Sequence, residues 1–173
     1  MTLPRGVVPE PAGPGQESVW DYPRPPRVEP TSEHVLVVLG GRVVVDTRAA
    51  LRVLETSHPP TYYLPFADAD AEALRPAAGQ SLLRVEGPGE PTSTSSVAAR
   101  ASRSWRPRPP GPTPTRRRAT ASLAGYLALY PGRMSSVTVD GEAVRPQAGG
   151  FYGGWVTDRV VGPFKGGPGS TGW

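Results

Sequence analysis

The sequence predicts a single small domain of the mainly β class, with one or two short helices. Two short runs rich in valine and leucine, Val35–Leu39 and Arg42–Asp46, are separated by only two glycines. Two later runs, Leu123–Leu129 and Ser135–Val139, have the same strand-like composition. Glycine and proline account for 21 and 23 of the 173 residues, which is typical of a chain with many turns. Short apolar runs punctuated by turn residues are the pattern of a β domain.

The first pair of runs predicts a tight β-hairpin. Gly40 and Gly41 can both adopt the positive φ angles that a two-residue hairpin turn requires. Valine and leucine follow one another almost without polar interruption in both runs. We therefore expect these strands to be buried on both faces or to lie at the centre of a sheet.

A short helix is predicted to follow this hairpin. Asp46 or Thr47 can cap it, and the apolar residues at positions 50, 51 and 54 then share one helical face. Pro59 and Pro60 end the helix because proline has no amide donor. A further strand is expected over residues 61–64.

Two more elements are predicted further along the chain. Asp68 and Asp70 precede an alanine-rich segment that favours one turn of helix, ended by Pro76. Asp140 and Gly141 supply the turn of a second hairpin, in which residues 142–144 pair back on residues 135–139.

The ends of the chain differ from its middle. Residues 1–16, rich in proline and glycine, predict a flexible leader, and residues 17–173 form the single domain. Trp20 to Arg27 combines aromatic residues with a proline run, which predicts an arm pinned across the sheet or, alternatively, a proline-motif ligand. Residues 149–173, rich in glycine and aromatic residues, are expected to wrap the domain and insert rings into grooves. The alternative for this tail is an aromatic platform for a ligand.

Composition argues against several classes of protein. The chain has no cysteine, so it has neither a disulfide framework nor thiolate chemistry. No run reaches the roughly 18 to 20 apolar residues of a membrane span, and the N-terminal sequence lacks a signal-peptide core. We therefore expect a cytoplasmic protein without a membrane partner. Its oligomeric state is left open.

The net charge of +4 is concentrated in one segment. Residues 82–120 contain eight arginines and two glutamates, whereas the rest of the chain carries 11 basic and 13 acidic residues. A nucleic-acid-binding function would have to use the arginines between residues 100 and 118. Because Arg116–Arg118 has no interleaved aromatic residues for base stacking, we expect nucleic acid to be a weak, salt-sensitive partner at most.

One cluster of polar and aromatic residues resembles a binding site. Glu55, His58 and two tyrosines lie close together in the sequence and could bind a small polar ligand or perform general acid–base work. The competing interpretation is a histidine hydrogen-bonded at the end of an element. The candidate ligand-binding residues are Arg48, Arg52, Glu55, His58, Tyr62 and Tyr63. With two histidines, one of them a surface residue at position 34, and no cysteine, we expect no metal site and no cofactor.

A second candidate is the tripeptide Asp68-Ala69-Asp70. It matches the D-x-D pattern by which nucleotidyltransferases hold magnesium. Aspartates at the start of a helix are also favoured as caps and by the helix dipole, which is the simpler explanation.

Several segments resemble the bacterial "domain of unknown function 427" family. They read DTRAALRVLETSHPPTYYLP at residues 46–65, ESVWDYPRPPR before it, and LAGYLALYPGRM and VDGEAVRPQAGGFYGGWVT after it. The resemblance covers most of residues 17–173. It implies a compact, mainly β fold similar to the β-tent group, with no established activity. Some classifications give the family a nucleotidyltransferase-like label, which is the reason to test the two aspartates.

Residues 82–121 depart from that family pattern. This segment contains five large apolar residues without any periodicity, so as written it predicts a disordered loop. Where the family has Cys-Glu-Trp-Lys-Gly, residues 82–87 can be back-translated with allowed codons that, read one base on, give Ser-Cys-Glu-Trp-Lys-Gly. Residues 109–116 can likewise be back-translated so that reading two bases on gives Ala-Trp-Pro-Tyr-Pro-Asp-Pro. We hypothesise a frameshifted stretch, which sequencing the coding DNA of this segment tests directly.

Three functions follow from the sequence. The first is a domain that binds a small polar ligand at the cluster around His58. The second is an enzyme, nucleotidyltransferase-like or otherwise, that uses His58 or the pair Asp68 and Asp70. The third is a basic interaction protein that works through residues 100–118.

Overall fold

The computed structural model describes residues 3–4, 6–76, 83–85, 100–101, 123, 125–150, 152–170 and 173. Within these residues the chain consists of short strands and two single 3₁₀ turns, η1 (Phe66–Asp68) and η2 (Pro131–Arg133). The predicted mainly β class is therefore confirmed. The stretch 82–121, in which a frameshift is hypothesised, lies outside the described residues except for the backbone of 83–85 and 100–101.

The first sheet has four strands. They are β3 (Val35–Leu39), β4 (Arg42–Thr47), β11 (Ser136–Val139) and β12 (Glu142–Ala143), in the order β12-β11-β3-β4. Both of its predicted hairpin turns are present. Gly40 and Gly41 have φ angles of 58° and 78°, and Asp140 and Gly141 have φ angles of 49° and 83°. Positive φ at both central residues is the geometry that lets strands continue with their natural twist.

The continuous valine run of β4 is explained by a bulge. The pairing between β3 and β4 shifts between Val37 and Val38, so Val44 is an extra residue in β4. As a result Val44 and Val45 are both 1% exposed, whereas Val43 is 46% exposed. Strand β3 lies between β11 and β4, as expected for a run of apolar residues at the centre of a sheet.

The second sheet has five strands. They are β2 (Arg27–Pro30), β5 (Leu51–Leu54), β6 (Thr61–Pro65), β10 (Tyr126–Ala128) and β9 (Arg100–Ala101), in the order β2-β5-β6-β10-β9. Three two-stranded pairs complete the structure. They are β1 (Glu17–Ser18) with β15 (Val160–Val161), β7 (Leu74–Pro76) with β8 (Leu83–Val85), and β13 (Arg145–Pro146) with β14 (Trp155–Val156).

The prediction of a helix after the first hairpin is wrong. Thr47 is the last residue of β4, and Leu51–Leu54 forms strand β5 between β2 and β6. Backbone pairing on both sides of β5 outweighs the weak helical spacing of three apolar residues, because propensity is easily overridden by tertiary context. The helical turn predicted before Pro76 is also wrong. The Asp70 carboxylate instead accepts hydrogen bonds from the amides of Glu72 and Ala73, and strand β7 follows.

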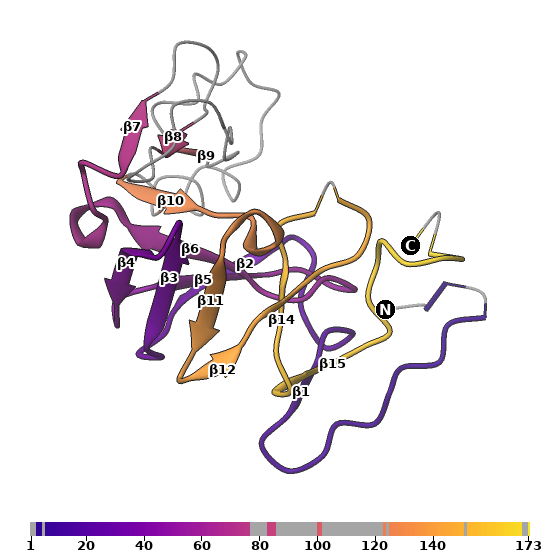
Figure 1. Ribbon diagram of the computed structural model, residues 1–173. Coiled ribbons are helices and arrows are strands. Elements are labelled where there is room, and N and C mark those ends of the chain that lie inside the picture. Colours follow the sequence, from indigo (N-terminus) through magenta and orange to yellow (C-terminus); the bar gives the residue numbers. More distant parts are fainter. Residues whose placement is uncertain are drawn as a thin grey trace, which may run out of the picture.

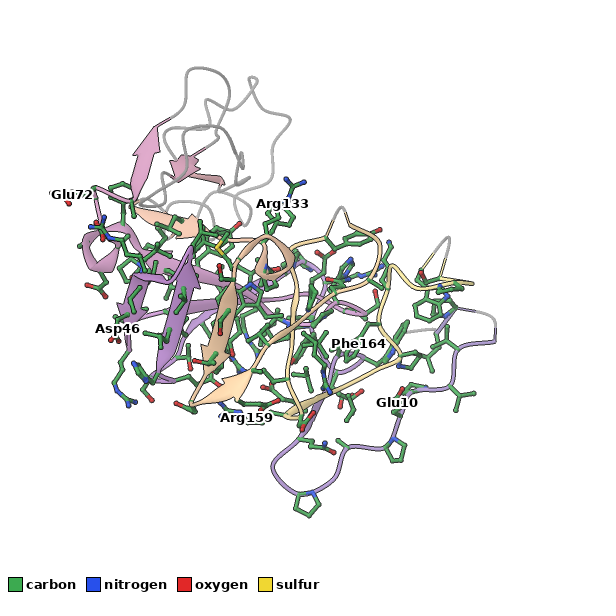
Figure 2. All side chains as sticks on the ribbon, in the orientation of Figure 1. Glu10, Asp46, Glu72, Arg133, Arg159 and Phe164 are labelled. Carbon is green, nitrogen blue, oxygen red and sulfur yellow. The ribbon has the colours of Figure 1, made fainter. Side chains whose placement is uncertain are left out.

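The core consists of two clusters. The larger is made of buried side chains from both sheets, and Figure 2 shows the side chains on the ribbon. Its largest members are Tyr62, Leu64, Leu127, Leu129 and Trp155, with valines from β3, β4 and β11. The smaller cluster joins Val19, Tyr22, Leu54 and Val160, and Trp20 and Phe164 pack against it. Figure 1 shows β1, β15 and both labelled chain ends gathered on the side of the molecule away from β4.

No helix in the part of the chain that the structure describes is long and apolar enough to cross a membrane.

Candidate functional site

The segment Glu55–Pro60, which we call the His58 loop, joins β5 to β6 and has an unusual backbone. Ser57 has a φ of 71° although it is not glycine, and it is completely buried. A left-handed residue with a side chain costs on the order of 1 kcal/mol or more and persists only where its surroundings hold it. The contacts around this loop must therefore fix its conformation.

The N-terminal arm holds the loop from one side. The amide of Ser57 donates to the carbonyl of Val19 at 3.0 Å, and the Thr56 hydroxyl donates to the carbonyl of Tyr22 at 2.5 Å. Arg24 reaches the same two loop residues with its guanidinium, at 3.3 Å from the Thr56 carbonyl and 3.4 Å from the Ser57 hydroxyl. These bonds satisfy polar groups that burial would otherwise leave without partners.

The C-terminal tail holds the loop from another side. The amide of Lys165 donates to the Ser57 carbonyl at 2.8 Å, and the amide of Trp155 donates to the Pro60 carbonyl at 2.8 Å. Gly154 passes so close that a Cβ there would lie 2.7 Å from Cγ of Pro59 and 2.2 Å from Oε1 of Gln147. The His58 loop is thus enclosed by segments from both ends of the chain.

His58 is half-buried at the centre of this arrangement. Its Nδ1 lies 3.1 Å from the Thr56 carbonyl, which assigns the proton of the neutral ring to Nδ1. Tyr152 contacts the ring edge-on, with centroids 5.3 Å apart. Burial lowers the pKa of His58, and the positive charges of Lys165 and Arg24 lower it further, against the Thr56 carbonyl and Glu55. The ring is therefore neutral at pH 7, with Nε2 as its acceptor atom.

This depressed pKa predicts a loss of stability on acidification. The unfolded chain takes up a proton on His58 as the pH falls below 6.5, whereas the folded chain resists protonation to a lower pH. Stability should therefore decrease below pH 6.5, a range above that in which Asp70 and Asp140 titrate. Urea denaturation at pH ~7.5 and ~5.5 measures this difference.

Two variants give this measurement its controls. His58→Gln should show a smaller difference between the two pH values than the unchanged protein. His34→Gln should keep the difference, because His34 lies away from the loop in an exposed pair with Asp46. If His58→Gln loses as much stability between the two pH values as the unchanged protein, the assignment of this pH dependence to His58 is wrong.

A row of charged and phenolic side chains crosses the second sheet beside the loop. Glu29, Arg52 and Tyr62 are directly opposite one another on β2, β5 and β6 and so share a face. The Arg52 guanidinium binds Glu29 and, at 2.5 Å, Glu17 of β1. The Tyr62 hydroxyl donates to Glu33 at 2.6 Å. The pKa of Tyr62 is raised, mainly because the hydroxyl is buried and also because it is bonded to the Glu33 carboxylate. Arg52 thereby ties the arm to the sheet and already carries two carboxylates.

The six predicted site residues occupy different places. Glu55 and His58 lie together in the loop, and Arg52 and Tyr62 lie together in the row. Tyr63 is the neighbour of Tyr62 on β6, so its side chain points to the opposite face of the sheet. Arg48 is exposed after β4, where its guanidinium lies 3.5 Å from the Ser32 carbonyl and its charge acts on Asp140.

The aspartate pair is held by protein partners. Asp68 accepts a hydrogen bond from the Thr47 hydroxyl at 2.5 Å, and Asp70 forms a 2.5 Å ion pair with Arg42. Asp70 also caps the following turn, as the simpler explanation of this motif proposed. Among the residues that the structure describes, no three histidine, aspartate or glutamate side chains are grouped to hold a metal ion. The arginines between 103 and 118 lie outside the described residues.

Sequence reasoning missed the residues that surround His58. Arg24, Tyr152 and Lys165 come from the arm and the tail, and no local pattern connects them to the loop. The sequence signal that could have suggested them is the aromatic composition of the tail, which predicts that its rings insert into the domain.

The chain is a small mainly β domain, in which two antiparallel sheets share a core. Its candidate binding site is the strained His58 loop, which both ends of the chain enclose. The chain belongs to the family described as "Domain of unknown function (DUF427)", whose family model matches residues 27–140. This confirms the resemblance read from the sequence. The comparison with curated proteins found no match, and neither did the comparison with solved structures. Arg24, Tyr152 and Lys165 lie outside the matched range.

Proposed function

We propose that this protein is a binding domain for a small polar ligand that carries negative charge, and that the His58 loop is its binding site. One observation carries the proposal. The Arg24 guanidinium contacts Thr56 and Ser57, the main chain of Lys165 binds Ser57 so that its charge acts on His58, and within the described residues neither cation makes a salt bridge with an acidic side chain. Unpaired cations around a preorganised loop are suited to an anionic group.

Other features of the loop support the same proposal. The neutral His58 ring offers Nε2 as an acceptor, for which the described residues supply no hydrogen-bond donor. The strain at Ser57 is a feature that clusters at ligand-binding sites. The proposal keeps Glu55 and His58 from the predicted set and gives Arg52 the task of fixing the arm. It places the domain in the bacterial cytoplasm, in keeping with a cysteine-free sequence.

Inorganic phosphate is the probe that tests the proposal. At ten times its Kd, phosphate should stabilise the folded state by about 1.4 kcal/mol, which corresponds to a rise in Tm of about 3–6 °C. In Arg24→Gln, Lys165→Gln and His58→Gln at least half of this rise should be lost. Differential scanning fluorimetry over a phosphate titration measures it.

Arg145→Gln is the matched control. Arg145 lies exposed on β13, paired with Asp158, so its replacement removes the same charge away from the loop. This variant should keep the full rise in Tm. If it loses as much as Arg24→Gln, phosphate acts on the net charge of the protein, and the proposed site is wrong.

A further inference from the structure

A second feature lies next to the loop, where residue 173 folds back onto the arm and the tail. The indole rings of Trp173 and Trp20 meet edge to face, with centroids 5.5 Å apart and an interplanar angle of 66°. The ammonium group of Lys165 donates to the main-chain oxygen of Trp173. One residue is thus held by its ring and by an oxygen atom at the same time.

The two residues that receive Trp173 are held firmly. Trp20 packs on the smaller core cluster, and its indole N–H donates to the Pro163 carbonyl at 3.0 Å. Lys165 is fixed through its main chain, because its amide donates to Ser57 and its carbonyl accepts from the side chain of the buried Gln147 at 2.7 Å. An aromatic ring and the main chain that carries the ammonium group are therefore held in place.

Trp173 itself is bonded to a short turn. Its amide donates to the Ser170 carbonyl at 3.2 Å, and Ser170 in turn bonds to Gly167. Gly169 in this turn has a φ of 79° and open space around it. The described contacts that hold Trp173 beyond this turn are the ring of Trp20 and the ammonium of Lys165.

We propose that Trp20 and Lys165 form a subsite for a small molecule that carries an aromatic ring and a carboxylate, and that Trp173 occupies this subsite from within the chain. The ring would pack against Trp20 as Trp173 does, in the edge-to-face arrangement that aromatic pairs prefer. The carboxylate would carry a charge opposite to that of the Lys165 ammonium and would accept a hydrogen bond from it. Trp173 is the internal competitor of such a ligand.

The inference rests on the proposed function in one respect, because Lys165 also borders the His58 loop. An ammonium group has three donors, and the bond to Trp173 takes one of them away from an anion at the loop. Release of Trp173 would therefore open the aromatic subsite and return that donor of Lys165 to the loop in a single step. This makes the last described residue a regulator of both positions.

Calorimetric titration with N-acetyl-L-tryptophan tests the proposal. Trp173→Gly should bind this probe about tenfold more tightly than the unchanged chain, because removing an internal competitor restores the intrinsic affinity. Trp173→Phe keeps an aromatic ring and should remain within about twofold of the unchanged chain. In Trp173→Gly, the probe's amide analogue should bind about tenfold more weakly than the acid, and adding Lys165→Gln should abolish that preference.

Two results would overturn the proposal. One is equal affinity of the unchanged chain and Trp173→Gly for N-acetyl-L-tryptophan. The other is equal binding of the acid and its amide in Trp173→Gly. Trp173→Gly leaves both core clusters untouched, so either result is informative.

The His58→Gln variant separates this proposal from the proposed function. It should leave the affinity for N-acetyl-L-tryptophan within about twofold, while at least half of the effect of phosphate on Tm is lost. If phosphate does not raise Tm in the unchanged chain or in any variant, but the tryptophan probe binds as expected, the subsite is supported and the function proposed for the loop is wrong. If phosphate raises Tm as expected but the tryptophan probe does not distinguish the variants, the subsite is wrong and the function proposed for the loop is supported.

Discussion

Replacing Trp155 by alanine is expected to lower the free energy of unfolding by about 3–5 kcal/mol, because Trp155 is the largest fully buried side chain among the residues that the structure describes. Trp155 is completely buried, and its ring stacks on Tyr62 with centroids 4.7 Å apart. Its indole N–H donates to the Leu129 carbonyl at 3.1 Å. Removing the indole leaves a cavity between the sheets and a buried carbonyl without its donor. Urea denaturation measures the loss.

Trp155→Phe is the matched control for this prediction. Phenylalanine preserves a ring on Tyr62 but has no N–H for the Leu129 carbonyl, so we expect a smaller loss of about 1–3 kcal/mol. Losses of equal size in the two variants would mean that the hydrogen bond, and not the packing, holds the tail to the sheets. A loss below about 1 kcal/mol in Trp155→Ala would contradict the burial of this residue.

Replacing Gly154 by alanine is expected to cost about 2–3 kcal/mol, although it adds one methyl group. The new Cβ would lie 2.2 Å from Oε1 of Gln147, 2.7 Å from Cγ of Pro59 and 3.1 Å from the Pro59 carbonyl oxygen. The Gln147 side chain is itself bonded to Lys165 and the proline is rigid, so neither gives way freely. The tail must move off the His58 loop, which should also weaken the response to phosphate.

Gly132→Ala is the control for Gly154→Ala. A Cβ at position 132 would lie 3.4 Å from its nearest neighbour, a side-chain atom of Pro146. The same methyl group should therefore change the stability by no more than about 0.5 kcal/mol. Thermal unfolding of the two variants side by side makes the comparison, and similar losses in both would argue against a close contact at Gly154.

The hairpins could be predicted from the sequence because their signals are local. Gly40 and Gly41 have no side chain to resist positive φ, and Asp140-Gly141 is a favoured hairpin pair. The bulge at Val44 could not be predicted in this way. It depends on how β3 and β4 meet the opposite sheet, and the valine run alone is compatible with several registers.

Strand β5 shows why the element after the first hairpin was mistaken. Residues 50, 51 and 54 have helical spacing, but the chain here is the middle of three paired strands, with β2 arriving from upstream and β6 from downstream. The error also affected the candidate site. On a strand, Arg52 faces Tyr62 and Glu29, whereas a helix would have placed it beside Arg48.

The candidate site could be predicted only in part. His58 and Glu55 were found because they share one short loop. The cations beside them were not, since Arg24 and Lys165 become neighbours only when both ends of the chain fold onto Ser57. Adjacent tyrosines were grouped in the prediction, but alternation along β6 separates Tyr62 from Tyr63.

The left-handed Ser57 also has a consequence for the order in which the protein folds. Its carbonyl partner, Lys165, is synthesised long after the sheets that flank the loop, so this conformation cannot be secured until the tail has been made. Closing contacts between distant parts of a chain is slow compared with forming hairpins. We infer that the sheets form first and that the loop stays open until the tail docks, which makes competence for binding the last property that the growing polypeptide acquires.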